Sequence, residues 1–280
     1  MPAAGGLAAG GLRYAAAIGA EAIQVFAANP RGWAVPPADP AQDAALRTAA
    51  SDGQLPVFVH APYLINLGSP DPRVRDLSVA ALQHALARGG QLGARGVVVH
   101  TGSAVGGDPA AALRQVREVL LPLLEALASD GPGLLLEPMA GQGTMLCSGV
   151  AELRAYLAML DWHPRAGLCL DTCHAFAAGH DLAAPGGAAR LLADLESAGC
   201  ADRLRLVHAN DAKDPCGSGR DRHENIGSGH LGTGPFGELL GHPATAGVPF
   251  IVETPGGEQA HAADVAVLQG LRAAACGQQA

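Results

Sequence analysis

The sequence predicts a parallel α/β barrel of the TIM (β/α)8 type, with the first strand missing from this chain. Seven short, almost continuously apolar segments are typical of strands buried on both faces, since each is bounded by Gly, Pro or polar residues. Six of the seven end on a His, Asp or Glu. The chain has 280 residues, close to the length of about 250 residues at which such barrels form one domain. The segments are 22–26, 57–60, 96–100, 134–137, 166–171, 204–208 and 249–253.

Helical segments alternate with these strands. The alternation predicts right-handed βαβ units that share one parallel sheet. The sequence contains no internal repeat and no Pro- or Gly-rich linker that would separate domains, so we expect a single domain over residues 1–280. The predicted helices cover 41–52, 72–92, 109–130, 149–160, 186–200 and 258–275.

The start of the chain lacks the strand that would complete a barrel of eight. After Gly5 and Gly6 the sequence runs directly into a plausible helix, LAAGGLRYAAAIGA. Either the barrel is open at this seam, or translation starts upstream of Met1. We favour the second explanation, because an open seam leaves two sheet edges unpaired.

Composition restricts the compartment and the partners. No run of 18 apolar residues predicts a membrane span, and the first residues lack the basic and apolar regions of a secretion signal. The six cysteines form no CxxC pair, which favours reduced thiols in the cytoplasm. A net charge of -8 argues against a nucleic-acid partner, unless bound cations offset it locally.

The residues that end the strands predict a metal centre. Carboxyl ends of parallel strands meet at one mouth of a barrel, so these side chains are expected to converge. Neutral imidazoles and carboxylates brought together are typical metal ligands. The six residues are His60, His100, Glu137, Asp171, His208 and Glu253.

Two further segments add ligands to this set. His174 follows Asp171 by three residues, and Asp221 and His223 alternate in a long loop rich in Gly, so both can face one ion. The nine candidates exceed the needs of one tetrahedral ion and fit two or three ions that share a carboxylate. The imidazole content favours zinc, with manganese or iron as alternatives.

Seven stretches along the chain resemble the endonuclease IV family, whose members are zinc-dependent apurinic/apyrimidinic endonucleases on a TIM barrel. The similarity runs from Ala3 to about residue 256. The stretches are HAPYLINLGSPD (60–71), VHTGS (99–103), LEPMAGQG (136–143), DTCHAFAAGHD (171–181), HANDAKDP (208–215), DRHENIGSGHLG (221–232) and VETPG (252–256).

The resemblance implies three zinc ions per chain. By motif, the first ion is held by His60, His100 and Glu137. Glu137 bridges to the second ion, which also binds Asp171, His208 and Glu253, while His174, Asp221 and His223 hold the third. All nine family ligand positions carry the expected residue types.

The resemblance also implies a reaction and a partner. We expect hydrolysis of the phosphodiester 5′ to an abasic site in double-stranded DNA, leaving a 3′-hydroxyl and a 5′-deoxyribose phosphate, and removal of blocking groups from 3′ ends. Either Glu137 or Glu253 would accept the proton. Arg31 would enter the base stack, and Tyr63 and Leu64 would wedge into the minor groove. A monomer is expected.

Two alternatives remain open on the sequence. A sugar isomerase or epimerase on a xylose-isomerase-like barrel shares the strand-end carboxylates and a metal centre. It does not account for Asp221 and His223 together with His174. A barrel that binds damaged DNA without cutting it is the other alternative.

Overall fold

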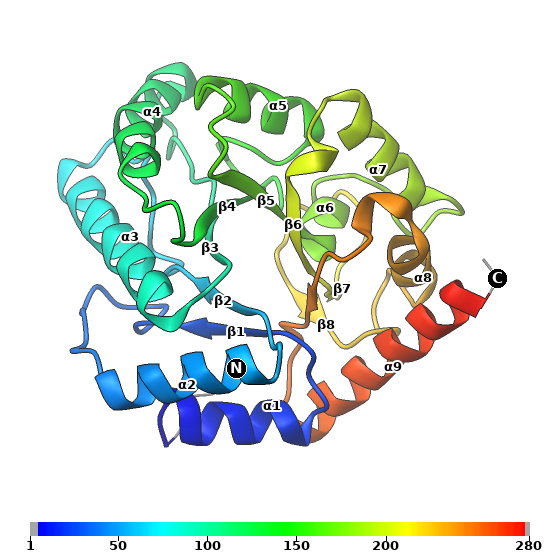
Figure 1. Cartoon of the computed structure of the whole chain (residues 1–280). Coiled ribbons are helices and arrows are strands. Elements are labelled where there is room, and N and C mark those ends of the chain that lie inside the picture. The colour runs from blue at the N-terminus through cyan, green and yellow to red at the C-terminus, as the bar shows by residue number, and fades with distance from the viewer. Residues whose placement is uncertain (1–4, 278–280) are drawn as a thin grey trace. The chain divides into compact units, whose positions relative to one another are not determined.

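The fold is built on seven parallel strands whose order in the sheet follows the chain. A computed structural model describes residues 5–277 (Figure 1). The hydrogen-bonded order is β1-β2-β3-β4-β5-β6-β9, and all seven predicted strands are confirmed. They are β1 (Ile23–Phe26), β2 (Val57–His60), β3 (Gly96–His100), β4 (Gly133–Glu137), β5 (Ala166–Asp171), β6 (Leu204–His208) and β9 (Phe250–Ile251). Within the described range no strand precedes β1, and Ala3, where the family resemblance begins, lies outside that range.

The six helices predicted between the strands are also present. Asp39, Asp71 and Asp108 each cap a helix that starts on a proline, since their carboxylates accept backbone N–H groups of the first turn. The helix predicted over 109–130 ends earlier, at Glu125. The helices are α2 (Pro40–Asp52), α3 (Pro72–Leu92), α4 (Pro109–Glu125), α5 (Val150–Met159), α7 (Gly187–Ser197) and α9 (Glu258–Gly277).

The N-terminal helical segment and several short elements complete the list. Residues Leu7–Leu12 form a π-helical segment, η1, that continues into α1 (Arg13–Ala17). The sequence analysis missed the remaining elements, all of them short. They are α6 (Thr172–Ala177), the 3-10 turns η2 (Ala201–Arg203) and η3 (Pro243–Thr245), the strands β7 (Asp211–Ala212) and β8 (His223–Glu224), and α8 (Gly234–Gly241).

The chain forms two compact units. Of the described residues, the first unit contains 5–137, 143–146 and 156–168, and the second contains 138–142, 147–155 and 169–277. The prediction of a single domain over 1–280 stays a prediction, and residues 1–4 and 278–280 lie outside the described part. None of the helices in residues 5–277 is both long enough and apolar enough to cross a membrane.

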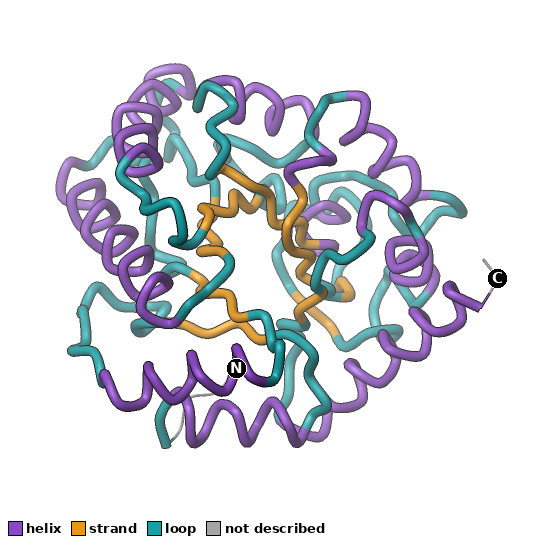
Figure 2. Tube along the Cα trace, viewed as in Figure 1, coloured by secondary structure: helices purple, strands orange, loops and turns teal. Residues whose placement is uncertain are grey.

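In the first unit, strand register places the predicted ligands beside one another. Val97 pairs with Val59 on one side and with Leu134 on the other, and all three side chains are fully buried. The same register continues to the strand ends, where His100 lies opposite Glu137. Helices α2, α3 and α4 cover the outer side of these strands (Figure 2).

In the second unit, two strand pairs position His208, His223 and the segment that leads to Glu253. Parallel pairing of β6 with β9 sets His208 opposite Ile251, two residues before Glu253. The antiparallel pair β7–β8 sets Ala212 opposite His223, so this small hairpin fixes the loop that contains Asp221. The second unit therefore brings ligands from strand ends and from a loop into one region.

Candidate metal centre

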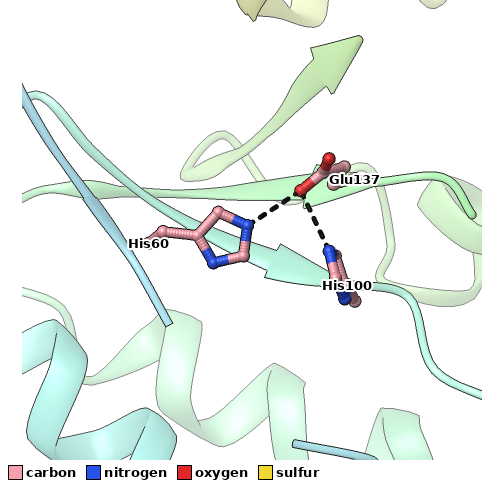
Figure 3. A group of neighbouring side chains, drawn as sticks. All are labelled: His60, His100 and Glu137. Atoms are coloured by element: carbon pink, nitrogen blue, oxygen red, sulfur yellow. Dashed lines mark hydrogen bonds and ion pairs between the residues drawn. The ribbon is translucent and has the colours of Figure 1, made fainter. Parts of the chain in front are cut away.

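The first unit contains a cluster of His60, His100 and Glu137. The Nε2 atoms of the two imidazoles lie 3.2 and 3.5 Å from the same carboxylate oxygen, Oε2 of Glu137. Figure 3 shows both rings directed at this carboxylate. His60 and Glu137 are almost completely buried, whereas the His100 side chain keeps 14% of its surface exposed. The cluster is thus a buried group of imidazoles and a carboxylate in which only the His100 side chain is partly exposed.

A hydrogen bond at the ring nitrogen that does not face Glu137 fixes the orientation of the His60 ring. Its Nδ1 donates a hydrogen bond to the carbonyl of Ala61 at 2.6 Å, since a carbonyl can only accept. In neutral imidazole this leaves the Nε2 lone pair facing Glu137. Two acceptors do not attract each other at 3.2 Å, so the pair needs a proton or a cation between them. Metal-ligating histidines commonly show this arrangement.

The second unit contains a cluster around Asp171, His208 and Glu253. His208 Nδ1 lies 3.3 Å from Glu253 Oε2 and 3.8 Å from Asp171 Oδ2. Asp171 and His208 are completely buried, while the Glu253 side chain is 17% exposed. The other oxygen of Asp171 caps α6 by accepting the N–H of His174 at 2.9 Å. This cap ties the end of β5 to the next ligand along the chain.

His174, Asp221 and His223 form the adjoining group in the same unit. His174 Nε2 lies 3.2 Å from one oxygen of Asp221, and His223 Nε2 lies 3.0 Å from the other. Each ring again donates its Nδ1–H to a carbonyl, His174 to Pro138 and His223 to Glu253. Ligand atoms of Asp171, His174 and His223 lie within 4.8 Å of one another, so this group and the preceding cluster share Asp171.

Electrostatics in this group favour positive charge. Burial by itself lowers the pKa of His223, but Asp171, Asp221 and Glu253 together raise it to about 9. Burial opposes ionisation of Asp221, yet hydrogen bonds from His174 and His223 hold its pKa well below the usual value. The residues present therefore fit divalent cations, because their donor types suit zinc and their carboxylates attract positive charge.

Asn210 connects three of the ligand-bearing segments, and the sequence analysis missed it. Its side chain is fully buried, donates to Asp171 Oδ2 at 2.7 Å and accepts the backbone N–H of Glu253 at 2.8 Å. Its backbone exchanges hydrogen bonds with the Thr172 hydroxyl. Asn210 therefore fixes the ends of β5 and β9 relative to β6.

Asp211 organises the loop that follows His223, and it was also missed. The carboxylate is fully buried and accepts five backbone N–H groups at 2.7–3.2 Å. Gly229 packs so closely on it that a Cβ there would meet Asp211 Oδ1 at 2.5 Å. The five donors are Ala212, Gly227, Gly229, Leu231 and Gly232.

The residues predicted to contact DNA lie on loops of the first unit. Arg31 is exposed, and 41% of Tyr63 and 37% of Leu64 are exposed. The Tyr63 ring stacks on the His100 ring with a centroid distance of 5.7 Å, and its backbone N–H donates to the Pro30 carbonyl. The loop that carries Arg31 is thereby bound to the loop that carries Tyr63 and Leu64.

The cysteines take no part in disulfides as far as the structure describes them. Five are present as thiols, and burial raises the pKa of the Cys173 thiol. This thiol donates to the Arg222 carbonyl, between the ligands Asp221 and His223. The five are Cys147, Cys169, Cys173, Cys200 and Cys216.

Comparison with known proteins identifies the family. Residues 12–271 match the family model described as xylose isomerase-like TIM barrel. A protein of Streptomyces coelicolor called probable endonuclease 4 is 56% identical over 97% of this chain and 93% of its own length. A counterpart with the same name from Methanoculleus marisnigri is 41% identical over 85% and 84%.

Structural comparison agrees. The crystal structure of endonuclease IV from Thermus thermophilus superposes with a TM-score of 0.83 and 34% identity, covering 95% of this chain and 94% of that one. A D-tagatose 3-epimerase-like protein shares the fold at a TM-score of 0.71 and 20% identity, over 93% and 91%. With its TIM-barrel fold and these relatives, the chain belongs to the endonuclease IV family.

Proposed function

We propose that this protein is a DNA-repair endonuclease that hydrolyses the phosphodiester 5′ to an abasic site. The observation that carries the proposal is the orientation of the histidines. His60, His174 and His223 each donate Nδ1–H to a carbonyl and direct Nε2 at a carboxylate. Such rings are ready to bind cations without rearrangement. The endonuclease names of the relatives support the assignment of DNA as the substrate.

The proposed centre holds three zinc ions. His60, His100 and Glu137 would bind the first, and Glu137 would be shared with the second. Bound zinc would supply Lewis-acid stabilisation to the phosphate and to the leaving oxygen. The second ion would also bind Asp171, His208 and Glu253, and the third would bind His174, Asp221 and His223.

The reaction needs a base for the attacking water. The water oxygen forms a bond to phosphorus, the bond from phosphorus to O3′ breaks, and the water proton passes to a carboxylate, while the departing O3′ takes up a proton from solvent. Glu253 suits this role better than Glu137, because its side chain is 17% exposed against 1% and can return the proton to solvent. The products would carry a 3′-hydroxyl and a 5′-deoxyribose phosphate. The same attack would remove blocking groups from 3′ ends.

Recognition of the abasic site would use the loops of the first unit. Arg31 would enter the gap in the base stack, and Tyr63 and Leu64 would wedge into the minor groove. The stacking of Tyr63 on His100 holds the wedge beside a ligand of the first ion. We further propose that the protein acts as a monomer in the cytoplasm, in keeping with the five described cysteines, which are thiols.

The direct test is incision of a defined duplex. The purified protein is incubated with an oligonucleotide duplex that carries one tetrahydrofuran analogue of an abasic site, with an EDTA-treated sample as the metal-free control. A nick on the 5′ side that EDTA abolishes and added zinc restores supports the proposal. Tight binding without a nick would instead favour a non-cleaving binder of damaged DNA. Interconversion of sugars without incision would favour an isomerase.

A further inference from the structure

Neither the backbone conformation nor packing in the core explains why residue 105 is a valine. Ala104 to Gly107 form a tight turn closed by the bond from Gly107 N–H to Ala104 C=O at 2.8 Å. Both central residues have positive φ, +49° for Val105 and +78° for Gly106. Turns with two positive φ values favour Gly, Asn or Asp at the first central position. A β-branched residue there is strained.

Burial of the Val105 side chain does not offset this backbone strain. Val105 is 61% exposed, the largest exposed fraction among the large apolar side chains described in the structure. Ala104 beside it is buried. The turn thus has a buried base and an apolar tip in solvent, so its valine is not required for packing within the first unit.

The surroundings hold this conformation firmly. Ala104 N–H donates to the Thr144 carbonyl at 2.9 Å, and Gly106 N–H donates to the Thr144 hydroxyl at 2.9 Å. The Ser103 hydroxyl accepts the N–H of Val105 itself at 3.1 Å. Bonds on both sides of the tip therefore fix Val105 in its exposed position before any partner binds.

The turn is joined to the loop that carries the proposed minor-groove wedge. Asn66 Oδ1 accepts the N–H of Ser103 at 3.0 Å and that of Gly68 at 3.1 Å. Leu64 stands two residues before Asn66, and Val105 stands two residues after Ser103. The side chain of Asn66 therefore ties the turn that carries Val105 to the loop that carries Tyr63 and Leu64.

We propose that Val105 is a further contact to duplex DNA, packing against deoxyribose in the minor groove beside the abasic site. Residues 102–107 carry no charged side chain, so close approach to phosphates meets no like-charge repulsion from them. The neighbouring Asp108 is engaged in capping α4, where it accepts the N–H groups of Ala110 and Ala111. The inference rests on the proposed function, because its partner is the abasic duplex.

The experiment separates the contact from the strain. Zinc-loaded wild type, Val105→Gly, Val105→Asn and Val105→Leu are titrated by fluorescence anisotropy into a duplex with a tetrahydrofuran site and an uncleavable methylphosphonate on its 5′ side. Val105→Gly and Val105→Asn should bind about fivefold more weakly, whereas Val105→Leu should bind like wild type. The same Gly and Asn variants should melt at or above the wild-type temperature, because they relieve the positive φ. Val267→Ala, on exposed apolar surface of α9, is the control and should leave binding unchanged.

Three outcomes would overturn the inference. Equal binding by wild type and Val105→Gly, with Tyr63→Ala clearly weaker, rejects Val105 as a contact while the proposed function stands. Weaker binding together with a lower melting temperature in both the Gly and Asn variants shows a structural role instead. Absence of any preference of the wild type for the abasic duplex rejects the inference and the proposed function together.

Discussion

Substitution of Asn210 by Ala should weaken metal binding far more than its effect on folding alone would suggest. The change removes two hydrogen bonds inside a fully buried site, one to the Asp171 carboxylate and one from the Glu253 N–H. A bond to a charged group contributes about 2 kcal/mol and a neutral one about 1 kcal/mol, so the free energy of unfolding should fall by about 3 kcal/mol. For a chain of this size, the melting temperature should fall by roughly 6–10 °C.

The effect on metal affinity follows from the position of the lost bonds. Asp171 would keep its charge but lose the donor that fixes one oxygen, and the backbone at Glu253 would lose its anchor. Loss of a residue that orients metal ligands lowers affinity by about 10–100-fold. Zinc affinity is measured by competition with a chromophoric chelator on the apo protein, and the melting temperature by differential scanning calorimetry.

Two variants make this prediction specific. Asn210→Asp keeps the acceptor for the Glu253 N–H but replaces the donor to Asp171 with a carboxylate oxygen, so it removes the Asp171 bond and adds charge repulsion there. Gln115→Ala serves as the matched control, since it also removes two side-chain hydrogen bonds, to the carbonyls of Leu67 and Ser69, in a part-buried site. Asn210→Ala with a lowered melting temperature but wild-type zinc affinity would refute the reasoning.

Three other predictions concern catalysis, the loop after β8, and pH. Glu137→Gln should abolish incision of an abasic duplex while the circular dichroism spectrum stays that of the wild type, and near-normal turnover would contradict its proposed role as the shared ligand. Asp211→Asn should lower the free energy of unfolding by about 2–4 kcal/mol, because an amide cannot accept five N–H groups as a carboxylate does. The control is Asp202→Asn, at a side chain that is 76% exposed, and it should change the melting temperature little. Equal effects of the two substitutions would show that the five hydrogen bonds do not stabilise the loop. Burial lowers the pKa of His84, and the charge of Arg88 lowers it further, while a hydrogen bond to the Ala27 carbonyl opposes the shift. Neutral His84 should therefore stabilise the fold above pH 6.5, and this contribution should be lost as the pH falls below 6.5. Between pH 7.5 and 5.5 the melting temperature of the wild type should therefore fall more than that of His84→Gln. Equal falls in the two proteins would contradict the predicted loss of stability at low pH.

The sequence predicted the regular framework well, because its signals are local. β5 and β6 were predicted with their observed bounds, since apolar runs, interrupted in β6 only by Arg205, end sharply at Asp171 and His208. Helix α3 was likewise predicted over its observed range, because Asp71 and Pro72 mark its start and Gly93, with φ +68°, follows its end.

The missed elements are short and lack periodicity. Helix α6 has six residues, and its TCHAFA sequence was interpreted only as a source of ligands. Strands β7 and β8 have two residues each, so alternation cannot be recognised in them. Helix α8 contains three glycines, which lower its helix propensity.

Within the site, the sequence did not predict the buried residues that hold the ligand-bearing segments in place by hydrogen bonds. Every predicted ligand ends a strand or belongs to a quoted motif, and the structure groups all nine into clusters within their own units. Asn210 and Asp211 follow His208 in what reads as a polar loop. Their complete burial depends on chain segments 16–43 residues away in the sequence, which no local pattern reveals.

The central claim, that nine residues from distant parts of the chain hold three zinc ions, is tested most directly by X-ray diffraction at the zinc absorption edge. Crystals of the zinc-loaded protein should show three anomalous peaks, one contacting His60 and His100, one contacting His208 and Glu253, and one contacting His174 and His223. A single peak, or peaks bound by other residues, would contradict the account.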